Sequence, residues 1–179
     1  MIYSVLLSLA LAAGVACTDK EKAPDVAGSV RQALDQAGLK NVSVSQDRDK
    51  GVVTLTGDVP TDGAKSQANS IAQSIAGSQV VSNEIAVRPT GDESTARTVD
   101  SDLDKGIDKN LDAKLVQLRM NHDVRYDVKN GVVTLKGNVP SQSKRSMVEK
   151  AASGVPNVKQ VVNEIEVKGQ KATSTGRGY

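Results

Sequence analysis

The sequence predicts an α+β protein built from two tandem copies of one small unit. The residues GVVTLTGDVP from Gly51 to Pro60 return as GVVTLKGNVP from Gly131 to Pro140, an offset of 80 (131 minus 51). The residues VSNEIAV from position 81 return as VVNEIEV from position 161 at the same offset. Two matches in one register indicate an internal repeat in which each copy is one structural unit.

Each copy reads as helix, strand, strand, helix, strand. The first helix carries an apolar stripe with helical period, made of Val26, Val30, Ala33, Leu34 and Ala37 in one copy and of Leu103, Ile107, Leu111, Leu115 and Leu118 in the other. The second helix begins after Pro60 or Pro140, near Thr61 or Ser141. The strands between and after the helices are short runs of alternating polar and apolar residues.

Alternation in the strands predicts one face against the helices and one face in solvent. The inward residues are Val53 and Leu55, with Val133 and Leu135; the expected solvent-facing residues are Thr54 and Thr56, with Thr134 and Lys136. Asn130-Gly131 between two such runs predicts a β-hairpin. The hairpin joins the first two strands, and the third strand could lie beside either of them.

Glycine and asparagine recur at fixed places in both copies. Gly57 and Gly137 stand at core-facing strand positions, which predicts a bulge or the close approach of another backbone. Asn83 and Asn163 share the inward parity, so we expect each amide to hydrogen-bond a neighbouring loop or strand edge, since a buried amide without a partner is costly. The remaining signature residues are the turn glycines Gly51 and Gly131.

The chain starts with an uncharged stretch from Met1 to Cys17 that ends in LAAGVAC. It resembles a bacterial lipoprotein signal, which implies acylation of Cys17, although Gly14 replaces the usual branched residue and no positive charge precedes the apolar run. Soluble periplasmic export and an uncleaved anchor are the alternatives. We therefore predict a signal peptide at 1–16, a tether at 17–24, domains at 25–88 and 100–168, a linker at 89–99 and a disordered tail at 169–179.

Composition excludes several function classes. The 23 basic and 21 acidic residues argue against a general nucleic-acid binder. The chain has no Trp, no Phe and three Tyr, which argues against an aromatic ligand pocket or a base-stacking platform. The single histidine, His122, falls in a predicted loop without a Cys/His cluster or a triad. We therefore predict no catalytic residue, no metal and no cofactor.

Each copy resembles the BON domain, named for bacterial osmotically inducible and nodulation proteins. The resemblance rests on a G-x-V-x-L-x-G-x-V strand and an N-E-I-x-V strand, found at Gly51–Val59 and Asn83–Val87 and again at Gly131–Val139 and Asn163–Val167. It implies two αββαβ domains, each a three-stranded mixed sheet with two helices on one face. It also implies an envelope lipoprotein, of the outer membrane facing the periplasm, that binds phospholipid or envelope proteins without catalysis.

The two copies differ in charge. Residues 25–88 hold six basic and seven acidic residues, whereas residues 100–168 hold twelve and ten. Lys144, Arg145 and Lys150 are expected on the outer face of the second helix, beside Lys136, where they could meet anionic phospholipid head groups or form an ordinary solvated surface. The alternative function is a protein-interaction or chaperone-like module, which an exposed apolar patch near Ala68 and Ile71 would favour.

Overall fold

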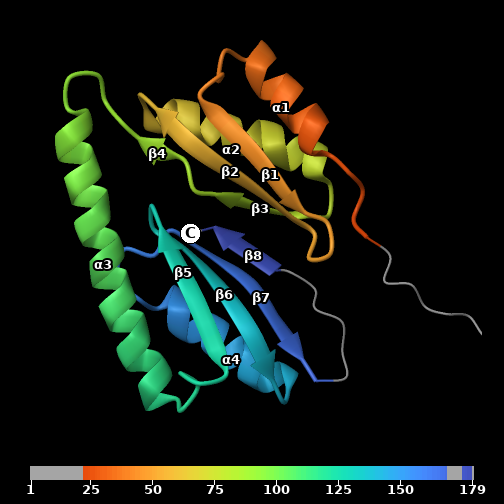
Figure 1. Ribbon diagram of the computed structural model, residues 1–179, viewed down its shortest axis with the longest axis vertical. Helices are drawn as coiled ribbons and strands as arrows, with labels where there is room; N and C mark the ends of the chain where they lie inside the picture. The colour runs from red at the N-terminus through yellow and green to blue at the C-terminus, as the bar shows by residue number, and fades with distance from the viewer. Residues whose placement is uncertain (1–21, 169–174, 179) are drawn as a thin grey trace, which may run out of the picture.

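The computed structural model describes residues 22–168 and 175–178. Its elements form two α+β halves, domain 1 and domain 2 (Figure 1). Domain 1 contains α1 (Ala27–Gln36), β1 (Val42–Asp47), β2 (Val52–Val59), α2 (Asp62–Ala76), β3 (Val80–Asn83) and β4 (Ala86–Val87). Domain 2 contains α3 (Glu93–Gln117), β5 (Val124–Lys129), β6 (Val132–Val139), α4 (Gln142–Ser153), β7 (Gln160–Val167) and β8 (Thr175–Gly178). The predicted fold class and the repeated element order are confirmed.

In both sheets the third strand lies beside the second. β1 and β2 are antiparallel neighbours, and so are β5 and β6. β3 and β4 pair with β2, and β7 pairs with β6, all in parallel. Parallel neighbours need a crossover connection, which α2 and α4 provide. The strand order that the sequence left open is therefore β1-β2-β3 in domain 1 and β5-β6-β7-β8 in domain 2.

Two segments that we expected to be irregular contain regular structure. β8 lies within the tail 169–179 and adds a fourth strand antiparallel to β7. α3 begins at Glu93, inside the predicted linker 89–99. The chain has no Gly or Pro between Gly91 and Gly106, so no residue there stops a helix. The low apolar content of this stretch reflects a largely exposed helix end and not a linker.

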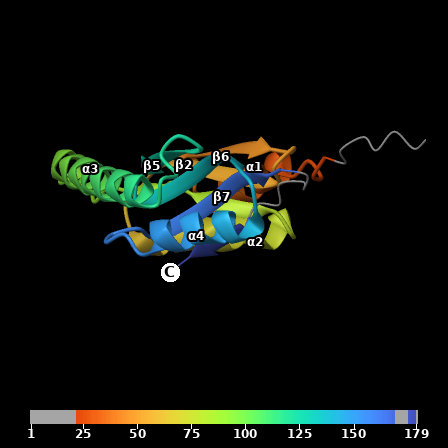
Figure 2. The same cartoon turned by 90° about the horizontal axis from the view of Figure 1, so that it is seen from below.

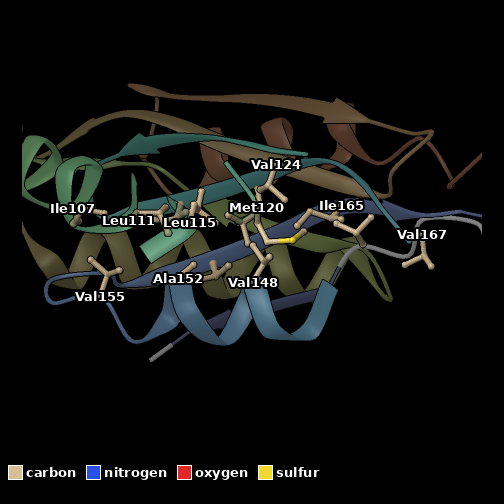
Figure 3. Close-up of a cluster of buried hydrophobic side chains, with 14 residues drawn as sticks. Ile107, Leu111, Leu115, Met120, Val124, Val148, Ala152, Val155, Ile165 and Val167 are labelled. Carbon is tan, nitrogen blue, oxygen red and sulfur yellow. The ribbon is translucent and has the colours of Figure 1, made fainter. Parts of the chain in front are cut away.

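Each sheet buries one face under the helices of its own domain. Figure 3 shows this core in domain 2, and Figure 2 shows α4 beneath β6 and β7. Residues from both helices and the strands between them fill this core, among them Ile107, Leu111, Leu115, Met120, Val124, Val148, Ala152 and Ile165. The core of domain 1 is built in the same way, from residues that include Val30, Leu34, Val53, Leu55, Ala68, Ala72 and Ile85.

Gly57 and Gly137 let another backbone segment approach the end of the signature strand. Their φ angles are +119° and +134°, a region that L side chains rarely adopt. A Cβ added at Gly57 would overlap the backbone carbonyl oxygen of Asn41, and one at Gly137 would overlap that of Asp123. Both carbonyls belong to the residue that precedes the first strand of their domain. Glycine is therefore required at these positions by the packing of two backbones.

The outer faces of the sheets, which the sequence placed in solvent, are partly buried against each other. Val52, Val80, Val132 and Val162 form an apolar cluster that joins the two domains. Thr134, expected to face solvent, is only 8% exposed. The alternation identified the outer face correctly, but the sequence contained no signal that this face of one copy covers the other.

The contacts around this cluster relate the two domains by an approximate twofold symmetry. Lys50 Nζ, in the β1–β2 turn, lies 3.2 Å from the Glu164 carboxylate on β7. Asn130, the residue that follows Lys50 by 80 positions, donates its side-chain amide to the backbone carbonyl of Glu84 at 2.7 Å. Glu84 in turn precedes Glu164 by 80 positions, and its carboxylate also pairs with Lys129 at 3.3 Å. Equivalent turns therefore contact equivalent strands in both directions.

Gln160 breaks this symmetry by covering the outer edge of β3. Its amide nitrogen donates to the backbone carbonyl of Val81 at 2.7 Å, and its amide oxygen accepts from the backbone N–H of Asn83 at 3.1 Å. The side chain thus makes the two hydrogen bonds that a neighbouring strand would make. In domain 2 the matching edge of β7 is covered by β8, which pairs with residues 160–163. Covering both edges removes a template for unwanted strand pairing.

Substitution of Gly137 tests the backbone approach. We expect Gly137→Ala to lower the free energy of unfolding by at least about 2 kcal/mol, because the added Cβ requires both a strained φ and displacement of the Asp123 carbonyl. Urea unfolding followed by circular dichroism measures the change. Gly106→Ala is the matched control: Gly106 lies inside α3 with no atom within 4 Å of an added Cβ, so this variant should gain about 0.5–1 kcal/mol. Equal midpoints for the two variants would contradict the packing role of Gly137.

Candidate functional site

The basic residues predicted to act together lie on opposite faces of the domain 2 sheet. Lys136 projects from β6 on the outer face and is exposed. α4 covers the inner face, where its Val148 and Ala152 join the core. Lys150 is exposed and Lys144 is partly exposed. The structure therefore does not bring Lys136 together with the cations of α4.

Arg145 was predicted to lie on the outer face of α4, and that prediction was wrong. The side chain is buried, with the residue 4% exposed. Its Nε donates to the backbone carbonyl of Ile165 at 3.0 Å, and its Nη2 donates to that of Asn163 at 2.8 Å. Burial lowers the pKa of the guanidinium, and the nearby charge of Glu149 partly opposes this shift. Arg145 completes the hydrogen bonds of β7 and cannot reach a membrane.

Lys65 has the same structural task in domain 1. It precedes Arg145 by 80 positions, and its Nζ donates to the backbone carbonyl of Ile85 at 2.7 Å. Burial, followed by the repulsion of Lys159, lowers the pKa of Lys65, while Asp100, Asp62 and Asp104 oppose the shift. A long cationic side chain from the second helix therefore binds backbone carbonyls of the equivalent segment in both domains, between β3 and β4 in domain 1 and within β7 in domain 2.

The signature asparagines connect the third strand to the helix that covers it. The side-chain oxygens of Asn83 and Asn163 accept from the backbone N–H groups of Ile85 and Ile165, at 3.3 and 3.2 Å. Their amide nitrogens donate to the α2 carbonyl of Lys65 at 3.3 Å and to the α4 carboxylate of Glu149 at 2.8 Å. We expected a loop or a strand edge as the partner. The oxygen instead accepts from a backbone N–H two residues along the chain, between β3 and β4 in domain 1 and within β7 in domain 2, and the nitrogen donates to the covering helix.

Lys136 lies in a different group of polar residues, which together line a cavity of about 450 Å³ on domain 2. Its register partner on β5 is Arg125, and both side chains are exposed. The remaining lining residues are His122, Asp123, Gly137 and Asn138. Arg125 was not among the site residues predicted from the sequence. The Asn130-Gly131 turn was the signal that could have identified it, because a two-residue turn places Arg125 directly opposite Lys136 on the neighbouring strand.

A second cavity, of about 470 Å³, is lined mainly by residues of α3 and β5, together with Arg88 of domain 1. Several of its charged groups have partners, either in the lining or beside it. Arg88 forms an ion pair with Asp100 and lies 3.8 Å from Asp58, while Asp104 accepts the backbone N–H groups of Asn130 and Gly131 at 2.8 and 2.9 Å. Burial, followed by the charge of Asp108, raises the pKa of Tyr126 in its wall to about 12. These contacts fix α3 and the β5–β6 turn in place.

The remaining predicted features concern metals, membranes and the leader. Within residues 22–168 and 175–178, no group of three or more His, Cys, Asp or Glu residues is arranged to hold a metal ion. In the same part of the chain, no helix combines the length and apolar character needed to cross a bilayer. Cys17 and the predicted signal peptide lie outside the described residues.

The family model of the BON domain matches residues 22–89 and 100–169, which correspond to the two structural domains. The chain belongs to the BON domain family. Among curated proteins, it is 29% identical over 146 residues to "Osmotically-inducible protein Y" of Escherichia coli (strain K12). That match covers 80% of this chain and 71% of the relative.

Two solved structures from Chlamydia trachomatis also match. Both are of CdsD, described as a structural protein of the Type III secretion system, and the second is its C-terminal domain. They are 15% and 16% identical with TM-scores of 0.32 and 0.31, and the matches cover 79% and 78% of this chain. This chain spans 61% and 66% of those two chains, less than two thirds of each. At these scores the likeness does not establish a shared overall arrangement.

The role of Arg145 can be tested by stability. Arg145→Met leaves the carbonyls of Asn163 and Ile165 without their donors, so we expect a loss of about 2–3 kcal/mol in the free energy of unfolding. Arg145→Lys should recover part of this loss, because Lys65 serves the equivalent strand in domain 1. Lys150→Gln, on the exposed side of α4, should change stability by no more than about 0.5 kcal/mol. If Arg145→Met and Lys150→Gln unfold at the same urea midpoint, Arg145 does not have this structural role.

Proposed function

We propose that this chain is a non-enzymatic protein of the cell envelope that binds anionic phospholipid surfaces and supports envelope integrity or osmotic-stress tolerance. Its two BON domains and its likeness to a protein named as osmotically inducible support this proposal. The wider BON family resemblance implies association with phospholipid or envelope proteins.

The observation that carries the proposal is the difference in surface charge between two domains of one fold. Lys136 and Lys150 occupy positions that Thr56 and Ser70 hold in domain 1, again at an offset of 80. Lys144 likewise replaces Ala64. Domain 1 forms the same sheet and helices without these cations, so the fold does not require them. An anionic partner would give these cations a function in domain 2.

Modest attraction would be sufficient for a protein held at the membrane. Each lysine or arginine near an anionic bilayer contributes about 1 kcal/mol of attraction. Stable attachment needs two signals, such as one lipid anchor and a basic surface. Acylated Cys17 would be the first signal, and domain 2 would supply the second. We therefore propose the periplasmic face of the outer membrane as the location, with a soluble periplasmic protein as the alternative.

The protein-interaction alternative has less support. Ala68 is fully buried, and Ile71 packs against the core of domain 1. These residues therefore form no apolar patch on α2 for an unfolded or partner protein to bind. The exposed large apolar residues of the described chain are Val99, Val116 and Met147, from α3 and α4.

Vesicle co-sedimentation tests membrane binding. We expect the fragment from Thr18 to Tyr179, which contains every described residue, to bind vesicles containing phosphatidylglycerol and not vesicles of phosphatidylcholine alone. Because the attraction is electrostatic, binding should weaken as salt is raised from about 0.05 to 0.5 M. Equal binding to the two kinds of vesicle, or binding that salt does not change, would contradict the proposed function.

A further inference from the structure

Arg125 and Lys136 place two like charges directly opposite each other on adjacent strands. They are register partners in the antiparallel β5–β6 pair, and both point to the outer face. Cross-strand partners have Cβ atoms about 5 Å apart, and like charges at that position destabilise a strand pair. The ion pairs within residues 22–168 include neither residue. Neither charge is therefore neutralised by an ion pair in this part of the chain.

An acidic side chain does lie next to Lys136, but it is engaged elsewhere. Glu164 is the register partner of Lys136 on β7. Its carboxylate lies 3.2 Å from Lys50 Nζ of domain 1, and it is only 7% exposed. Packing of the two domains thus directs Glu164 toward Lys50. Lys136 keeps its exposed charge beside Arg125 as a result.

Domain 1 supplies an internal comparison at the same place in the fold. There the equivalent register partners on β1 and β2 are Ser43 and Thr56. Each of these pairs lies next to a signature glycine, because Val42 pairs with Gly57 and Val124 pairs with Gly137. The same fold therefore forms in domain 1 with two hydroxyl side chains at this position. The two cations of domain 2 are not needed for folding.

The cavity around the two cations has the size and donors for a phosphate group. Its volume of about 450 Å³ lies within the range of ligand cavities, about 300–1,000 Å³. Arg125 can present a planar fork of N–H donors, and Lys136 a compact positive charge, to phosphate oxygens. His122 and Asn138 add a ring and an amide that can donate hydrogen bonds. Asp123 is the one acidic residue in the lining, against the two cations.

We propose that Arg125, Lys136 and His122 form a binding site for a phosphate ester, and that its occupant is the head group of an anionic phospholipid. This inference deepens the proposed function and rests on it. It places the contact on the outer face of the domain 2 sheet, on the opposite side of that sheet from α4. The ligand phosphate relieves the repulsion between Arg125 and Lys136, so binding is strongest where both charges are present.

Two double variants of the Thr18 to Tyr179 fragment separate this site from general charge. Arg125→Ser with Lys136→Thr installs the residues that domain 1 carries at the equivalent positions, so the fold should be retained. Lys144→Gln with Lys150→Gln removes an equal number of positive charges, two, from α4. We expect the first variant to lose at least about tenfold in affinity for phosphatidylglycerol vesicles. The α4 variant should lose less than about threefold.

The outcomes distinguish the site from the wider proposal. Equal losses in both variants, with vesicle binding by the unaltered fragment, would overturn the site and leave membrane binding standing. Inorganic phosphate, titrated while the amide NMR shifts of His122 and Asn138 are followed, tests the shared chemistry without a bilayer. Shifts that disappear in the Arg125→Ser, Lys136→Thr variant, without vesicle binding, would support a phosphate site and contradict its lipid occupant. If phosphate causes no shifts and the unaltered fragment does not bind vesicles, both proposals are overturned.

Discussion

The contact between the outer faces of the two sheets is the constraint on which the rest of the molecule depends. Each sheet has helices on one face only, so each domain alone would leave apolar residues of its outer face in water, and domain 1 would also expose the outer edge of β3. Val52, Val80, Val132 and Val162 cover each other across the domain boundary, and Gln160 covers the edge of β3. Small domains bury a limited share of their surface, about 60% for sixty residues, so this extra burial is important for both.

The same contact sets the chemistry of the exposed surface. It directs Glu164 to Lys50, and it leaves Lys136 opposite Arg125 with neither of them in an ion pair of the described chain. It also places the first turns of α3 beside domain 1, where Arg88 pairs with Asp100. Duplication therefore did more than repeat a domain. The arrangement of the two copies determines which charged groups are neutralised and which remain available to a ligand.

Sequence patterns predicted the features that depend on neighbours along the chain. The repeat and the alternation of residues such as Val53 and Leu55 identified the strands, and the parity of Gly57 and Gly137 indicated a close backbone approach. Contacts that depend on the third dimension were not predictable in this way. Arg145 follows Lys144 on a helix surface, and only the position of β7 shows that its guanidinium is buried. Thr134 has the parity of a solvent-facing residue, and only the second domain explains its burial.

The central claim is that the two BON domains move as one body. Backbone ¹⁵N relaxation of the Thr18 to Tyr179 fragment tests this most directly, because tumbling time depends on the size of the unit that rotates. The structure predicts one rotational correlation time for residues 22–89 and 100–168, that of a single particle containing both domains. Two shorter and different correlation times, each suited to one small domain, would contradict the face-to-face packing of the sheets and the surface that follows from it.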